Sequence, residues 1–145
     1  MRRLSRLLTM SWPERRLLFQ AALVVSVIRV GLWLLPFGTM ERALGALGGP
    51  PTTRRRGRAV PADAVALAVS RVAARVPGAT CLTQALAARL LLARRGYPAR
   101  LCVGFGRPIG GDLEGHAWVE SDGRVVLGGD LASYERLPRP GVAAR

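Results

Sequence analysis

The sequence contains no lysine, and all 22 of its basic residues are arginine. Its acidic residues number only nine. It has a single histidine, and its two cysteines follow no pairing pattern, which argues against a disulfide scaffold. It shows neither a cluster of metal-ligating residues nor a glycine-rich phosphate loop. We therefore expect no metal ion, nucleotide or other cofactor.

The net charge of +13 implies attraction to something acidic, such as a peptide, a partner surface, anionic lipid or nucleic acid. The arginines are dispersed, aromatic residues are few, and no nucleic-acid-binding module is recognisable, so nucleic acid is not the expected partner. A chain of 145 residues, half of them hydrophobic, is long enough for one domain with a real core.

The first part of the chain is predicted to be helical. Residues 11–14, Ser-Trp-Pro-Glu, have the pattern of a capping box, and the helix is expected to run from Arg15 to about Leu35. Its apolar part, residues 21–35, is shorter than a ~20-residue membrane span. Arg29 at its middle would cost roughly 2.5–3.5 kcal/mol in a bilayer. The segment is thus predicted to dock on protein in a cytoplasmic molecule, with membrane association as the alternative.

Two shorter helices are predicted to follow, one over residues 39–47 with Thr39 as its cap and one over residues 61–76. Between them, residues 48–58 combine helix breakers with a run of arginines, which is typical of a solvated linker. The expected division is a helical lead-in with its basic linker over residues 1–60 and a core over residues 61–145.

Cys81 opens an apolar helical run that ends near residues 94–96, Arg-Arg-Gly. A thiol in the first turn of a helix lies near the positive end of the macrodipole, which favours the nucleophilic thiolate. The alternative is a small buried hydrophobic residue.

After this helix the hydrophobic period changes from 3.6 to 2. Strands are predicted over residues 99–105, 115–121 and 124–128, with a tight Asp-Gly turn at residues 122–123. Cys102 alternates with core residues in the first of these strands. The predicted fold is α+β: N-terminal helices followed by a small antiparallel β-sheet.

His116 shares a strand face with Trp118 and Glu120. A lone histidine is usually structural, but a nucleophilic thiol needs a base, and imidazole titrates in the right range. Asp130, just after the next strand, could orient the ring, and Asp122 is the less favoured choice because it lies in the turn. The backbone amide of Cys81 could donate to an oxyanion.

Three stretches carry a resemblance to a known family: residues 81–86, residues 91–99, and the Gly-His-Ala-Trp-Val-Glu run at 115–120. They resemble the transglutaminase-like cysteine proteases, whose core is related to that of papain. More narrowly, with residues 12–37, they resemble the stand-alone leader peptidase of bacterial lasso-peptide biosynthesis.

The resemblance implies a hydrolase in which Cys81, His116 and Asp130 form a catalytic triad. The enzyme would cut the leader from a ribosomally made precursor peptide through a thioester. The implied partners are the leader region of that peptide, a separate leader-binding protein and a macrolactam synthetase.

Two other functions stay open at this point. An acyl transferase of the same fold would use the same three residues but pass the acyl group to an amine. A basic, non-catalytic adaptor protein would need neither Cys81 nor His116.

Overall fold

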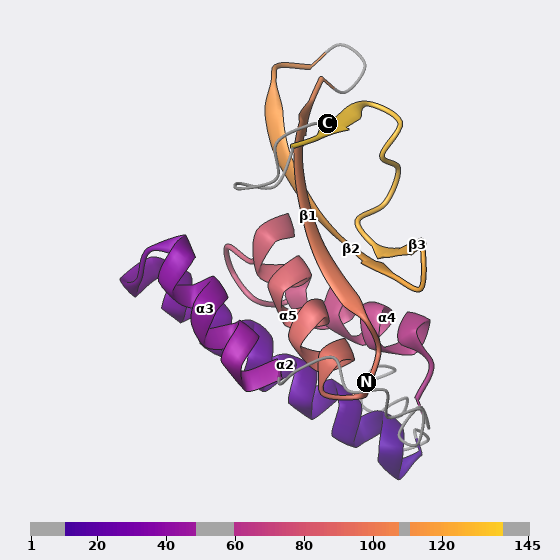
Figure 1. The fold of residues 1–145 in the computed structure, drawn as a ribbon. Helices are drawn as coiled ribbons and strands as arrows, with labels where there is room; N and C mark the ends of the chain where they lie inside the picture. The colour runs from indigo at the N-terminus through magenta and orange to yellow at the C-terminus, as the bar shows by residue number, and fades with distance from the viewer. Residues whose placement is uncertain (1–10, 49–59, 108–110, 138–145) are drawn as a thin grey trace, which may run out of the picture.

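A computed structural model describes residues 11–48, 60–107 and 111–137 of the chain. The predicted linker falls largely on residues outside these ranges. The elements run in the order α2 (Trp12–Leu34), α3 (Phe37–Gly48), α4 (Ala62–Ala73), α5 (Cys81–Ala93), β1 (Ala99–Gly106), β2 (Glu114–Ser121), β3 (Arg124–Leu127) and β4 (Tyr134–Arg136). Helices followed by an antiparallel sheet confirm the predicted α+β class (Figure 1).

Helix α5 lies at the centre of the molecule. It packs against α2, α3 and α4 and also against β1 and β2, and α4 in addition contacts β3 (Figure 1). Most of its residues are buried: Thr83, Ala85, Leu86, Ala87, Ala88, Leu90, Leu91 and Leu92. The alanines let neighbouring elements approach on all sides, which is the pattern of a core helix with no solvent face.

Helix α2 begins as predicted. The Glu14 carboxylate accepts hydrogen bonds from both the backbone amide and the hydroxyl of Ser11, each at 2.8 Å. Because these bonds stabilise the ionised carboxylate, the pKa of Glu14 is lowered. The helix buries one stripe, Leu17, Ala21, Val25 and Ile28, against the core.

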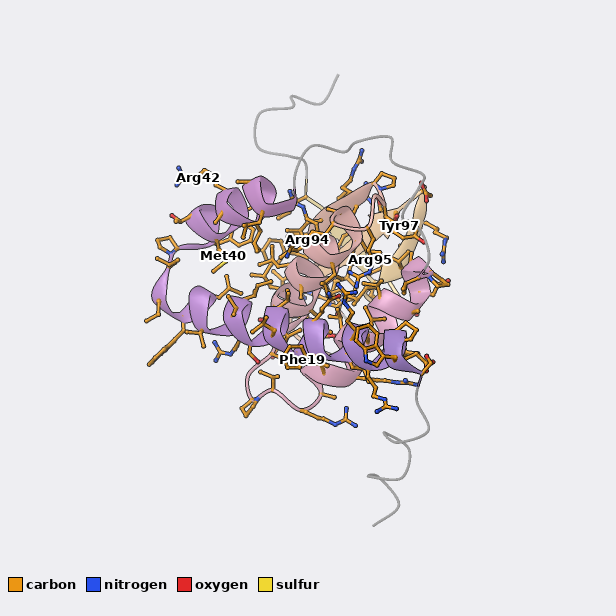
Figure 2. The ribbon with its side chains drawn as sticks, turned by 90° about the horizontal axis from the view of Figure 1, so that it is seen from below. Phe19, Met40, Arg42, Arg94, Arg95 and Tyr97 are labelled. Atoms are coloured by element: carbon orange, nitrogen blue, oxygen red, sulfur yellow. The ribbon has the colours of Figure 1, made fainter. Side chains whose placement is uncertain are left out.

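The opposite side of α2 exposes a second apolar stripe, formed by Phe19, Leu23, Val27, Val30 and Trp33. Phe19, which is labelled on this helix in Figure 2, has an exposed fraction of 72%. In the part of the chain that the structure describes, α2 is the one helix long and apolar enough to cross a membrane. This is weak evidence, because a core helix satisfies the same criterion.

Arg29 has a role inside the fold. Its Nε donates to the carbonyl of Pro77 at 3.4 Å, and its guanidinium covers Gly78, where a Cβ atom would lie 2.6 Å from it. Gly78 has a φ of 71°, in the left-handed region that glycine adopts readily. Arg29 thus links α2, through this hydrogen bond, to the turn that precedes α5.

Two predicted helices have different bounds. Helix α3 begins at Phe37 directly after Pro36, so Thr39 is inside its first turn and does not cap it. Helix α4 ends at Ala73. Residues 74–78, which include Pro77 and Gly78, form turns after it. The C-terminal end of α5 is as predicted, with Gly96 at a φ of 78°.

The sheet has the strand order β3-β2-β1-β4. Its β1–β2 pair is antiparallel and regular, with Gly104 opposite His116 and Cys102 opposite Trp118. The Asp122–Gly123 turn has positive φ at both residues, which confirms the predicted tight hairpin.

Strand β4 was not predicted from the sequence. It pairs with the end of β1, with Gly106 opposite Tyr134. A Cβ atom at Gly106 would lie 1.9 Å from the carbonyl oxygen of Ser133, and one at Gly104 would lie 2.2 Å from that of Glu135. The two glycines therefore allow the C-terminal segment to lie against β1.

Candidate functional site

Cys81 is the first residue of α5, and the elements around it fix its position. Thr80 caps the helix, with its hydroxyl accepting from the amide of Thr83 at 3.4 Å. This cap was not identified from the sequence, although threonine before a helical run is a common signal. Cys81 is half-buried and is a free thiol. Since the first amides of a helix lack intrahelical acceptors, those of this turn can donate to an oxyanion.

Cys102 is different. It is 4% exposed, lies within β1 and packs opposite Trp118. Its burial agrees with the predicted structural role, but it lies on the sheet face of Trp118 and outside the core cluster between the helices and the sheet.

His116 lies near the start of β2 on the sheet face that it shares with Trp118 and Glu120. The side chain of Trp118 donates to Glu120 at 3.2 Å, and its ring is stacked with the imidazole at 6.4 Å between centroids. The alternate residues, Ala117 and Val119, face the helices and belong to the core. The predicted alternation of the strand is confirmed.

The Nε2 atom of His116 lies 2.7 Å from the carbonyl oxygen of Gly128. Because a carbonyl can only accept, Nε2 carries the proton in this contact. A neutral imidazole then has an unprotonated Nδ1 that can accept a proton. The Gly128 carbonyl thus acts on the ring as the orienting group of a triad would.

Tyr134 lies beside this imidazole. Its ring lies 4.8 Å from that of His116 between centroids, and its hydroxyl donates to Glu114 at 2.5 Å. This hydrogen bond, then burial, then the negative charges of Glu114 and Cys81, raise the pKa of the Tyr134 hydroxyl. Phenol and imidazole therefore lie side by side at this end of the sheet.

The third predicted residue, Asp130, is exposed, and its Oδ1 accepts from the amide of Ala132 at 3.0 Å. Across residues 11–48, 60–107 and 111–137, no hydrogen bond links His116 to the carboxylate of Asp130 or to the thiol of Cys81. The triad therefore stays a prediction.

Gly128 holds its carbonyl against His116 because it has no side chain. Its φ is 139°, and a Cβ atom there would lie 2.3 Å from the Cβ of Trp118. Sequence reasoning missed Gly128 and Tyr134. The available signal for Gly128 was that a glycine ends the third predicted strand. Tyr134 lies in β4, whose three residues are too few to show a periodicity.

A protein-family model of the transglutaminase-like superfamily matches residues 22–139. The chain belongs to the transglutaminase-like superfamily. Members of this superfamily are usually cysteine-dependent enzymes, and the match covers α5, β2 and the positions of Cys81, His116 and Asp130. Comparisons with curated proteins and with solved structures gave no significant match.

In this transglutaminase-like protein we expect Gly128→Ala to displace the carbonyl that faces His116. Its left-handed φ and the contact with Trp118 should lower stability by about 1–3 kcal/mol. Gly129→Ala is the matched control, since its φ is also positive, 69°, but no atom lies within 4 Å of the position that its Cβ atom would take. Because the chain has one histidine, a proton NMR titration reports the ring directly. Identical imidazole titrations in both variants would contradict the assigned contact.

Cys81 should react with a mild alkylating reagent before Cys102 does. The first is half-buried at a helix start, whereas the second is covered by the sheet. Peptide mapping by mass spectrometry after brief labelling measures the order. Earlier labelling of Cys102 in the folded protein would contradict it.

Proposed function

We propose that the protein is a cysteine peptidase that removes the leader from a ribosomally made lasso-peptide precursor, with Cys81, His116 and Asp130 as its catalytic residues. The observation that supports the proposal is a free, half-buried thiol at the start of a buried helix that packs against the strand of His116. Membership of a superfamily of cysteine-dependent enzymes supports it.

In the proposed reaction the proton of the Cys81 thiol passes to His116, and the thiolate attacks the carbonyl carbon at the leader–core junction. The amide of Cys81 donates to the oxyanion. The C–N bond then breaks as the imidazolium protonates the departing amine, which leaves a thioester. Water, deprotonated by His116, cleaves the thioester, so that the leader leaves as a carboxylic acid and the thiol is restored.

An acyl transferase would follow the same course up to the thioester and then use an amine in place of water. Because Cys81 and His116 would serve both outcomes, the two functions differ only in the acceptor. Mass spectrometry of the products distinguishes them: hydrolysis adds water to the leader, whereas transfer adds the amine.

The proposed partners are the leader region of the precursor, a separate leader-binding protein and a macrolactam synthetase that closes the freed core. The exposed stripe of α2 offers a protein-docking surface, as apolar patches on soluble proteins often do. Insertion of α2 into a bilayer would remove Leu17, Ala21, Val25 and Ile28 from the core and break the contact of Arg29 with Pro77. This supports docking on protein in a cytoplasmic enzyme.

Cys81→Ala should abolish cleavage of the precursor peptide, and His116→Ala should cost nearly as much, roughly 10³-fold or more. The double variant should be hardly worse than either one, because groups that act in one step are not additive. Asp130→Ala should cost less, since the Gly128 carbonyl remains at the ring. Single-turnover cleavage measures these effects, with circular dichroism as the check on folding.

The control for the third residue is Asp122→Ala, in the hairpin turn. If Asp122→Ala is inactive and Asp130→Ala is fully active, Asp122 takes the place of Asp130 as the third residue. The assignments of the other two residues then stay as they are. Normal cleavage by Cys81→Ala would end the enzyme proposal and favour the adaptor function.

When the protein is made together with its proposed partners, we expect it in the soluble fraction. Replacement of Phe19 and Val27 by serine should weaken co-purification with those partners without unfolding the protein, because both side chains are exposed. Cell fractionation and pull-down measure the two effects. Recovery only in a membrane pellet that resists high salt and alkaline wash would contradict docking on protein.

A further inference from the structure

A groove of about 630 Å³ lies between the first turns of α2 and the last turn of α5, far from His116 along the fold. Its size falls in the range of sites for small ligands and short peptide segments. Arg95 joins the two helices beside it: its Nη2 donates to Gln20 at 2.6 Å and its Nη1 to the carbonyl of Leu91 at 2.9 Å. Figure 2 shows Arg94 and Arg95 together near the end of α5.

The groove concentrates positive charge without a compensating acid. Arg16, Arg94 and Arg95 all line it, and none of the described residues that line it is Asp or Glu. Burial, and then repulsion from Arg16 and Arg94, lower the pKa of Arg95. The three guanidinium groups therefore repel one another, and an anion bound among them would relieve that repulsion.

Apart from Gln20, which accepts from Arg95, the rest of the lining is apolar and includes Trp12, Leu17, Leu23, Val24 and Leu91. The guanidinium of Arg16 lies 5.9 Å from the centre of the Trp12 ring, a cation–π contact that holds both at the rim. A ligand that fits this lining must combine negative charge with an apolar portion.

We infer that the groove binds an acidic peptide segment, with carboxylates on Arg16, Arg94 and Arg95 and a neighbouring apolar side chain against Leu23 and Val24. Guanidinium forks match carboxylates bidentately, and three of them spread along a groove suit charges spread along a chain. A compact phosphate is less suited, because it has no apolar portion to lie against Leu23 and Val24. That the segment belongs to the substrate rests on the proposed peptidase activity, whereas the binding itself does not.

The test is fluorescence anisotropy with full-length Cys81→Ala protein and a labelled, blocked peptide, Glu-Leu-Glu-Leu-Glu-Leu. Arg94→Gln and Arg16→Gln should each weaken binding about fivefold to tenfold, as expected for loss of a charge-assisted hydrogen bond. Arg42→Gln, on the exposed side of α3, is the matched control and should change it less than about twofold (Figure 2). Peptides with Gln for Glu, or Ser for Leu, should also bind more weakly.

An equal loss in Arg42→Gln would overturn the groove as the site and indicate diffuse charge attraction. Equal affinity for the Gln peptide would overturn recognition of carboxylates. Binding of phosphatidylglycerol vesicles that depends on Arg94, without binding of the peptide, would replace the peptide by a lipid surface. The two proposals can fail independently. If the wild-type protein does not cleave but still binds the peptide through Arg94, only the proposed peptidase activity is refuted. If it cleaves but shows no such binding, only the proposed peptide site in the groove is refuted.

Discussion

Burial of α5 on all sides is the constraint on which the rest of the structure depends. Its residues contact α2, α3, α4, β1 and β2, and Leu86 and Leu92 are almost fully buried. Truncation of such a leucine typically costs about 2–5 kcal/mol, a large share of the stability of a small domain. The start of α5 is therefore fixed by the whole core, and with it the position of Cys81.

The surroundings of His116 depend on weaker and more local contacts. His116 is held by one carbonyl and two aromatic rings, and Tyr134 reaches it only because β4 adds to the edge of β1. Glycines at 104, 106 and 128 allow these close approaches. The chemistry of the site thus rests on backbone conformation as much as on the side chains with reactive atoms.

The sequence was sufficient for the parts of the fold with strong local signals. Periodicity predicted the helix that starts at Cys81, the alternation around His116 and the hairpin at residues 122–123. It failed where the determinant is not local. Strand β4 is short and depends on its partner strand, and the start of α3 is set by Pro36 and not by the polar residue that looked like a cap.

The same limit applies to the candidate site. Residue chemistry singled out Cys81, His116 and Asp130, because thiol, imidazole and carboxylate are the usual members of a nucleophilic site. The contact between His116 and the Gly128 carbonyl involves a backbone atom, which no side-chain pattern encodes. Likewise the groove needs Arg16 and Arg95 to meet from distant parts of the chain.

A helix enclosed by the core cannot bend or slide without disturbing every neighbour, so α5 behaves as a rigid spacer. Its 13 residues span about 20 Å from Cys81 to the end beside the arginine groove. An extended peptide advances about 3.3 Å per residue, and because it must pass over the elements that enclose α5, the two ends are separated by at least roughly six residues of peptide. In the proposed mechanism, the length of one buried helix would then set the shortest interval between an acidic anchor on a peptide and the bond presented to the thiol.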